Sequence, residues 1–239
     1  MPEIAVADPV GALVPHTLQQ QISGSGSGLL AGRTFKVKDL FAIEGRKVSN
    51  GNPDWYEAAS PAKETAQAIR RLLAAGATLT GITICDEFFY SVLGVNIQYG
   101  TPVNTQALRN VTGGSVRVPA AFCGLYGLRP TYGRIDVSGA TPMALSYDTV
   151  GFLARDSALF RAIGRVLLDG PRVDASLRRL IIAQDIISRS EASIVEEIWH
   201  VLDRIGLCPC RSISTWPVRT STIGATLFVS IRVSRFNRR

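Results

Sequence analysis

Two stretches decide the fold: RTFKVKDLFAI at residues 33–43 and ATLTGITIC at residues 77–85. In the first, Phe35 and Val37 alternate with lysines, which is the period of two that is typical of a β-strand. The second is rich in β-branched residues and predicts another strand. The segment between them predicts a helix. The unit is therefore strand, helix, strand, which favours an α/β fold whose strands are at least partly parallel.

The helix between the two strands has recognisable start and stop signals. Ser60 is the expected N-cap and Pro61 the first helical residue, while Gly76 ends the helix. Just before it, residues 51–54 (GNPD) predict a turn. The expected buried stripe of the helix consists of Ala66, Ile69, Leu72 and Leu73.

Two further elements are expected in the second half of the chain. Residues 179–183 (RLIIA) predict a buried strand, and residues 191–205 predict an amphipathic helix. The apolar side of that helix is expected to hold Ile194, Ile198, Val201, Leu202 and Ile205.

The chain divides into three segments by composition. Residues 1–28 form an N-terminal arm that ends in SGSGSG at 23–28, which predicts a flexible linker. Residues 29–205 contain the α/β domain, and residues 206–239 form a basic, atypical tail. The tail has no clear period and is not expected to pack with the body. A frameshift or an early termination in a longer gene would explain its composition.

Composition excludes several classes of protein. The 239 residues are 46% hydrophobic and 19% charged, which is ordinary for a globular protein that buries a core. No run approaches the roughly 18 to 20 apolar residues of a membrane-spanning helix. The first residues have neither the basic nor the apolar part of a secretory signal. We therefore expect a soluble, cytoplasmic protein that does not bind membranes.

The positive charge is concentrated in the tail. The net charge is +7, and residues 206–239 contain six arginines but no lysine and no acidic residue. The remainder of the chain is therefore nearly neutral. Arginines in the tail could contact phosphates nonspecifically, but the tail carries no recognised nucleic-acid-binding motif, so nucleic acid is an unlikely partner.

The chain has little material for a metal site. Its two histidines, His16 and His200, lie far apart, and its four cysteines form no CxxC pair. We expect Cys85 and Cys123 to be small core residues, because their surroundings in the sequence are apolar. A histidine-based catalytic triad is also disfavoured. No metal and no organic cofactor is predicted.

The densest chemical motif is TGGSVRVP at residues 112–119. Two glycines allow backbone conformations in which successive N–H groups converge on one point. Such groups stabilise a developing oxyanion, and Ser115 at the end of the loop would be placed to attack the same carbonyl. A simple Gly-Gly turn with a solvated serine explains these eight residues equally well.

The residues around this motif decide between the two interpretations. The segment TGGSVRVPAAFCGLYGLRPTYGRI at 112–135 closely resembles the central signature of the amidase signature family. Further similarity lies in FKVKDL, GNPDW, DEF, YGTPVN and SYDTVGFLARD, so that the resemblance covers residues 29–187. The details are most similar to plant and bacterial amidases of the indoleacetamide-hydrolase type. The family fold implies a central mixed, largely parallel β-sheet flanked by helices, incomplete in this chain.

The resemblance also implies roles for individual residues. The family uses a Ser, cis-Ser, Lys triad, and the match makes Ser115 the nucleophile and Lys38 the base. The resemblance also implies that the oxyanion hole consists of backbone N–H groups of the loop from Thr112 to Ser115, which includes Gly113 and Gly114. A lysine can act as a base only when it is neutral, so burial or cationic neighbours must lower its pKa from about 10.4.

One part of the family pattern is missing. The family has a GGSSSG loop and a helix between YGTPVN and the nucleophile loop, and this loop carries the cis-Ser that relays protons. Here YGTPVN at residues 99–104 runs through TQALRNV directly into residue 112, so the cis-Ser is absent. Thr101, Thr105 or Thr112 could offer a hydroxyl, but the sequence places none of them. Much of the C-terminal part of the family domain also has no counterpart.

Two functions follow. The first is a serine amidohydrolase that hydrolyses a small or aryl carboxamide to a carboxylate and ammonia, impaired by the loss of the cis-Ser loop. The alternative is a catalytically inactive amidase-like remnant or binding protein, and the missing relay favours this alternative for turnover by this chain. Positioned proton transfer typically contributes about 100- to 10,000-fold to a rate. The sequence determines neither the substrate nor the oligomeric state.

Overall fold

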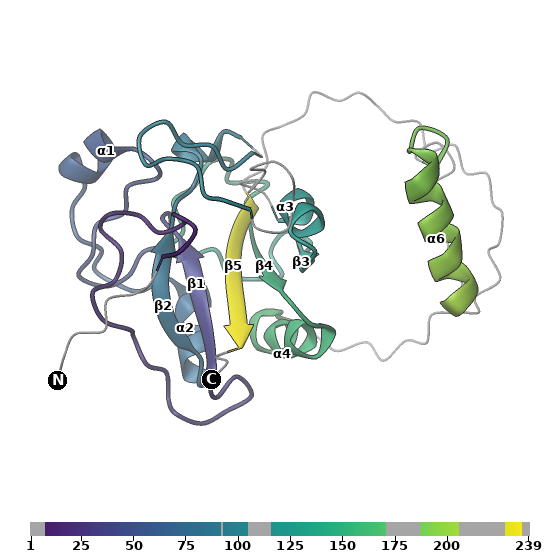
Figure 1. The fold of residues 1–239 in the computed structure, drawn as a ribbon. Coiled ribbons are helices and arrows are strands. Elements are labelled where there is room, and N and C mark those ends of the chain that lie inside the picture. The colour runs from purple at the N-terminus through teal and green to yellow at the C-terminus, as the bar shows by residue number, and fades with distance from the viewer. Residues whose placement is uncertain (1–7, 92, 105–115, 171–186, 206–227, 236–239) are drawn as a thin grey trace. The chain divides into compact units, whose positions relative to one another are not determined.

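The computed structural model describes residues 8–91, 93–104, 116–170, 187–205 and 228–235 (Figure 1). Residues 1–170 together with 225–239 belong to one compact unit, and residues 171–224 belong to a second. The elements in chain order are β1 (Arg33–Lys38), α1 (Pro53–Ala58), α2 (Gln67–Ala74), β2 (Thr78–Thr83), the 3-10 helix η1 (Glu87–Phe89), α3 (Arg117–Phe122), β3 (Tyr126–Leu128), β4 (Thr149–Ala154), α4 (Ser157–Leu167), α6 (Ala192–Ile205) and β5 (Phe228–Arg235).

The strands of the first unit form one five-stranded sheet in the order β2-β1-β5-β4-β3. The pairs β1–β2 and β4–β5 are parallel, whereas β1–β5 and β3–β4 are antiparallel. The predicted α/β class is therefore confirmed, and the sheet is mixed as expected. The expectation of a largely parallel sheet is not confirmed. The strand–helix–strand unit of β1, α2 and β2 is parallel as expected.

The main core lies between the sheet and two helices, α2 and α4, that contact each other. From β1 it takes Phe35 and Val37, which are fully buried, and from β4 it takes Phe152, whose ring lies 5.0 Å from that of Phe160 on α4. The next residue of β4, Leu153, belongs to a second cluster with Ala120 of α3. Because neighbouring residues of a strand point to opposite faces, α3 packs on the opposite face of the sheet from α2 and α4.

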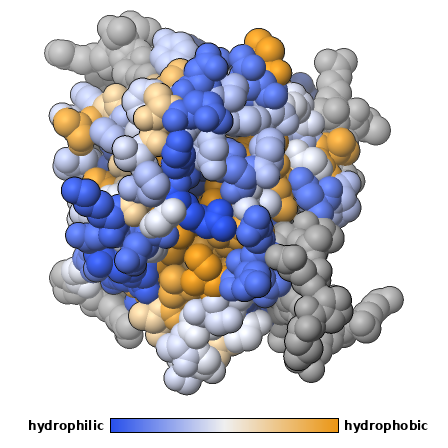
Figure 2. Space-filling view, turned by 90° about the vertical axis from the view of Figure 1, so that its left-hand side faces the viewer, coloured by the Kyte–Doolittle hydropathy of each residue, from blue (hydrophilic) through white to orange (hydrophobic). Residues whose placement is uncertain are grey.

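The N-terminal arm covers the outer edge of β2. The backbone groups of Ile22 and Leu79 exchange two hydrogen bonds of 2.9 Å, and the N–H of Val14 donates to the carbonyl of Ile82 at 3.1 Å. These bonds satisfy a strand edge that would otherwise be free to pair with another chain. Seen from the side of the arm and α1, the surface is largely hydrophilic, with one larger apolar area near its centre and smaller apolar areas toward the edges (Figure 2).

The glycine- and serine-rich end of the arm is not a flexible linker, so that expectation is wrong. Ser25 donates from its N–H to the carbonyl of Leu73 and from its hydroxyl to the carbonyl of Ala74, at 3.0 Å each. A Cβ at Gly24 would come within 2.4 Å of two backbone oxygens. The segment therefore supplies donors for the last carbonyls of α2, which have no partner inside the helix.

Helix α2 is shorter than predicted because its first expected turn has another role. The helix begins at Gln67, not at Ser60-Pro61. Residues 62–66 instead bond to residues 42–46: Ala62 donates from its N–H to the carbonyl of Arg46 at 2.8 Å, and Ala66 to that of Ala42 at 2.9 Å. These backbone groups are thus already paired when the helix starts. The buried stripe is confirmed for Ala66, Ile69 and Leu72, and Leu73 is partly buried.

Other boundaries also differ from the expectations. The strand expected over residues 33–43 ends at Lys38, because the N–H groups of Leu40 and Phe41 turn back to the carbonyl of Lys38. The strand expected over 77–85 covers Thr78–Thr83. The turn expected at 51–54 leads into α1, for which Asn52 is the N-cap.

Among the remaining expectations, the amphipathic helix in the second half is confirmed as α6. The strand expected at 179–183 lies outside the described residues. Cys85 is buried as expected, whereas Cys123 is only partly buried. The expectation that the basic tail does not pack with the body is wrong for residues 228–235, because β5 pairs with β1 and β4. The division of the chain into three segments by composition stays a prediction.

Candidate active site

Lys38 is the last residue of β1 and is only 5% exposed. It lies two residues after Lys36 and alternates with Phe35 and Val37, so it points away from the core formed by α2 and α4. Burial lowers the pKa of Lys38 from its ordinary value, while the negative charge of Asp86 acts in the opposite direction. Desolvation is the larger effect, so folding shifts the protonation equilibrium of Lys38 toward the neutral amine that a base requires.

The parallel pairing of β1 with β2 brings a buried thiol and a buried carboxyl to Lys38. Lys38 pairs with Thr83, the last residue of β2, and the chain continues directly into Cys85 and Asp86, which are 2% and 1% exposed. Burial raises the pKa of the Cys85 thiol to about 12. At neutral pH this thiol is therefore protonated, and only its thiolate form, at high pH, opposes the loss of a proton from Lys38.

Asp39, the residue after Lys38, bonds to three segments of the chain. Its N–H donates to the carbonyl of Thr83 at 3.0 Å, which ties it to β2. Its carboxyl accepts hydrogen bonds from the N–H of Ser49, at 3.2 Å, and from the Ser49 hydroxyl. Its carbonyl accepts from the N–H of Asn50 at 3.1 Å. The backbone that carries Lys38 is thus held on both sides.

The third segment that bonds to Asp39 is the N-terminal arm, through His16. Its Nε2 lies 2.8 Å from Oδ2 of Asp39, and the two side chains are 12% and 2% exposed. The ring stacks on Tyr56 with centroids 4.1 Å apart and meets the ring of Tyr99 edge-on at 5.9 Å. Ser49 donates to Asp39 and not to His16, so these three residues are not arranged as a nucleophile, base and orienting acid.

Asn96 joins three loops near Lys38 and is 2% exposed. Its Nδ2 donates to the carbonyls of Gly51 and Cys85, at 2.7 and 2.9 Å. Its Oδ1 accepts from the N–H groups of Gln98 and Tyr99, both at 2.8 Å. The amide therefore uses both ends of its side chain, and it holds the GNPDW, DEF and YGTPVN motifs together.

The DEF and GNPDW motifs also meet at α1. The side chain of Asn52 accepts from the N–H of Trp55, which caps α1, and donates to Glu87 at 2.6 Å. The rings of Trp55 and Phe88 meet edge-on with centroids 5.7 Å apart, and both side chains are partly exposed. Phe88 lies two residues after Asp86, so this aromatic pair is close in the chain to that buried carboxyl group.

Strain and unpaired acceptors concentrate in the same loops. Asn50, Phe88 and Phe89 have φ of 52°, 45° and 66°, a region that residues other than glycine rarely adopt. Among the described residues, Oδ1 of Asn50 and Oδ2 of Asp86 are buried acceptors with no hydrogen-bond partner. Strained backbone and unpaired buried acceptors each cost about 1–3 kcal/mol, and such features are frequent at functional sites.

The predicted site residues are only partly covered by the structure. Lys38 is described and buried, and its role as the base stays a prediction. Ser115 and the expected oxyanion residues Thr112, Gly113 and Gly114 lie outside the described residues, so their assignment stays a prediction. Of the hydroxyl candidates, Thr101 is half-buried, while Thr105 and Thr112 also lie outside the described part.

Sequence reasoning missed three residues of this site. His16 was set aside because the chain has only two histidines, and Ser49 and Asn96 carried no catalytic pattern. No local signal could have identified them, since His16 and Asp39 are 23 positions apart and Asn96 and Gly51 are 45 apart. Asp39 was expected to orient the backbone near Lys38, and its hydrogen bonds agree with that role.

The described residues contain no group of three or more His, Cys, Asp or Glu side chains that could hold a metal ion. No helix in the described part of the chain is both long and apolar enough to cross a membrane.

Comparison with known proteins gives a consistent family match. The family model described as Amidase matches residues 16–115 and 106–179. The two matches meet at residues 106–115, where the sequence analysis places the missing loop.

The similar proteins of known sequence are longer than this chain. Amidase 1 of Arabidopsis thaliana is 41% identical over 208 residues, which cover 76% of this chain and 49% of the relative. Translocon at the outer membrane of chloroplasts 64 of Pisum sativum is 36% identical over 181 residues, covering 65% of this chain and 30% of the relative. The chain thus spans at most about half of the length of these relatives.

Two solved structures are similar as well. One is described as "Crystal structure of amidase" and has a TM-score of 0.58 at 25% identity, covering 75% of this chain and 47% of the other. The second comes from "An unexpected vestigial protein complex reveals the evolutionary origins of an s-triazine catabolic enzyme", with a TM-score of 0.53 at 30% identity, covering 70% and 42%.

Proposed function

Because this chain belongs to the amidase signature family, we propose that it is a serine amidohydrolase that cleaves a small or aryl carboxamide. The observation that carries the proposal is Lys38, a buried lysine whose pKa is lowered by desolvation and whose backbone is held by the hydrogen bonds of Asp39. A neutral buried amine is the form that can accept a proton from a serine.

The proposed reaction has two halves. Ser115 attacks the carboxamide carbon while Lys38 accepts the proton of its hydroxyl, and the N–H groups of Thr112, Gly113 and Gly114 stabilise the oxyanion. Lys38 then returns the proton to the leaving nitrogen, and ammonia departs. Water attacks the acyl-enzyme, again with Lys38 as base, and releases the carboxylate. No metal or organic cofactor takes part in these steps.

The buried acceptors suggest how the substrate is oriented. Oδ2 of Asp86 and Oδ1 of Asn50 accept no hydrogen bond from any described residue. A primary carboxamide carries two N–H donors, which could satisfy such acceptors. The aromatic pair of Trp55 and Phe88 beside them would favour an aryl substituent.

The alternative is an amidase-like chain without turnover. It is favoured by the two separate family matches, which meet where the cis-Ser loop is missing. The relatives include the chloroplast outer-membrane translocon of Pisum sativum, so membership of the family does not by itself specify hydrolysis. The cytoplasmic location predicted from the sequence remains part of the proposal.

The test is ammonia release from a panel of carboxamides: phenylacetamide, indole-3-acetamide and propionamide. The wild-type chain is compared with Ser115→Ala and with Ser193→Ala, a matched control at an exposed position of α6. Release that Ser115→Ala abolishes and Ser193→Ala preserves supports the serine mechanism. Equal background release from all three chains would instead support the inactive alternative.

A further inference from the structure

The N-terminal arm delivers His16 to the residue that follows Lys38. The distance between Nε2 of His16 and Oδ2 of Asp39 is 2.8 Å, and both side chains are largely buried. A carboxylate oxygen only accepts hydrogen bonds, so Nε2 carries the proton and donates it. The bond spans 23 positions of sequence and joins the arm to the end of β1.

The orientation of the His16 ring is fixed by two other segments. Tyr56 of α1 stacks on it with an interplanar angle of 28°, and Tyr99 contacts its edge at 64°. The carbonyl of His16 also accepts a 3.4 Å hydrogen bond from Arg46. The ring of His16 is thus held on its face and its edge, and its main chain is held by Arg46. These contacts fix the direction in which Nε2 points toward Asp39.

Asp39 is joined to Lys38 by one peptide bond, so the contacts that fix the position of Asp39 also restrict the position of Lys38. Within the described part of the chain, the donors to its carboxyl group come from two residues, His16 and Ser49. Ser49 lies in the loop that follows β1, whereas His16 lies in the arm, so the two donors hold the carboxyl group from different parts of the chain. Removal of the His16 donor would leave a buried carboxyl group held from one part only.

We propose that His16 is a positioning residue for Lys38 that acts through Asp39, so that the docked N-terminal arm is part of the active site. This inference rests on the proposed function, because that function gives Lys38 its role as base. A displacement of about 1 Å in a reacting group can lower a rate about 100-fold. A small movement of Asp39 would therefore have a large effect at Lys38.

The experiment compares four full-length chains: wild type, His16→Ala, His16→Gln and His200→Ala. Glutamine offers an amide N–H where the histidine offers Nε2–H, so it tests for rescue. His200, the other histidine of the chain, is exposed on α6 and serves as the control. Each chain is treated with a fluorophosphonate, which phosphonylates an activated serine, and the labelling of Ser115 is followed by mass spectrometry over a range of probe concentrations.

We expect His16→Ala to lower the maximal labelling rate at least tenfold while the half-saturating probe concentration stays unchanged. His16→Gln should recover the rate to within about threefold of wild type, and His200→Ala should match wild type. Wild-type rates in His16→Ala would overturn the inference, as would a loss that His16→Gln does not restore at all.

A second measurement separates this inference from the proposed function. The chain has only four lysines, so 13C-labelled lysine gives four Cε signals, and Lys38→Met identifies that of Lys38. His16→Ala should shift the titration of the Lys38 signal and His16→Gln should restore it, whether or not Ser115 reacts. If Ser115 of the wild-type chain is not labelled but His16→Ala still shifts the Lys38 titration, the proposed function is refuted and the positioning role of His16 is not. An unchanged Lys38 titration in His16→Ala refutes the positioning role.

Discussion

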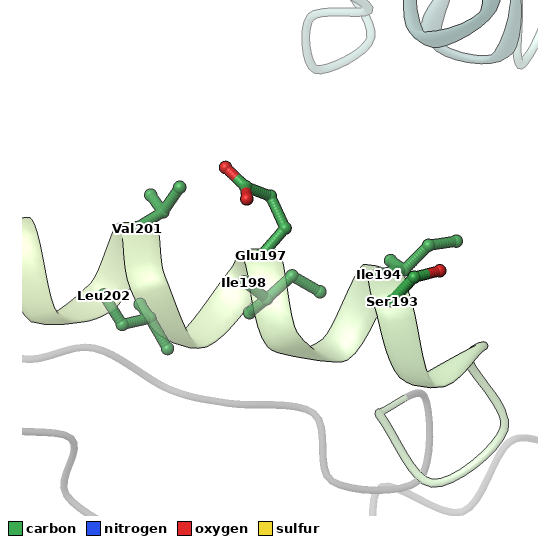
Figure 3. A pocket seen from close by; sticks show the side chains of 6 residues that line it. All are labelled: Ser193, Ile194, Glu197, Ile198, Val201 and Leu202. Carbon is green, nitrogen blue, oxygen red and sulfur yellow. The ribbon is translucent and has the colours of Figure 1, made fainter.

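The surroundings of Lys38 and the apolar face of α6 differ in where their contacts come from. Around Lys38, buried polar groups from the arm, the loop after β1 and the loop after β2 bond to one another. On α6, a groove of about 410 Å³ is lined, among the residues that the structure describes, by six residues of that helix. Figure 3 shows Ile194, Glu197 and Val201 projecting from one side of the helix.

The difference explains which of the two regions has the features of an active site. Ile194 and Val201 remain 51% and 41% exposed, and the groove has no polar groups that converge from other described elements. Binding sites for small molecules combine apolar walls with a few polar groups from different segments. The Lys38 region has polar groups from different segments, and the groove on α6 does not.

The largest expected effect tests whether Lys38 is the functional centre. Lys38→Met should lower the rate at which a fluorophosphonate labels Ser115 by about 100- to 10,000-fold, because the base that removes the serine proton is lost. Lys36→Met, two positions earlier in the same strand, is the matched control and should stay within about threefold of wild type. Equal rates in the two variants would remove Lys38 from the mechanism.

The next prediction compares the cores of the two regions. Leu72→Ala removes a fully buried side chain of α2 and should lower the free energy of unfolding by about 2–5 kcal/mol. Val201→Ala on the exposed face of α6 should change it by less than about 0.5 kcal/mol. Urea unfolding followed by circular dichroism measures both. A comparable loss from Val201→Ala would mean that the α6 face is covered in solution.

A third prediction concerns the amide that joins the loops. Asn96→Ala leaves two carbonyl groups and two N–H groups without partners and should cost about 2–3 kcal/mol in unfolding free energy. Gln98→Ala changes an exposed side chain in the same loop and should have little effect. If both variants unfold at the wild-type urea concentration, Asn96 does not hold these motifs together.

The smallest expected effect is a pH dependence of stability. The pKa of Lys38 is lower in the folded chain than its ordinary value of 10.5, so between the two values the unfolded chain binds more protons. The contribution of Lys38 therefore makes stability rise with pH in this window, by at most about 1.4 kcal/mol per pH unit. It is fully present above pH 10.5 and is lost as the pH falls through the folded pKa.

Cys85 acts in the opposite direction at higher pH. Its pKa is raised to about 12, so the unfolded thiol loses its proton first and the stability falls above pH 9. Both chains of the comparison contain Cys85, so the difference in unfolding free energy between wild type and Lys38→Met, followed from pH 7 to 10.5, isolates the lysine contribution. Lys38→Met should show a smaller rise of stability with pH than wild type, and identical slopes would contradict a lowered pKa for Lys38.

The sequence by itself determined the parts of the protein that depend on local pattern. The alternation of Phe35 and Val37 with lysines placed Lys38 on the opposite face of β1 from the helical core, because successive strand residues point to opposite faces. The apolar stripes of α2 and α6 predicted helices at those positions. The motifs at 112–135 and around Lys38 identified the family.

Only the tertiary structure decided which of these residues meet. Helix α2 begins at Gln67 and not at the expected Ser60, because residues 62–66 bond to residues 42–46. The glycine- and serine-rich segment packs against the end of α2. The tertiary structure also brought His16 and Asn96 to the loops beside Lys38. Periodicity and capping describe neighbours a few positions apart, whereas these contacts join residues more than 20 positions apart and depend on how the whole chain is connected.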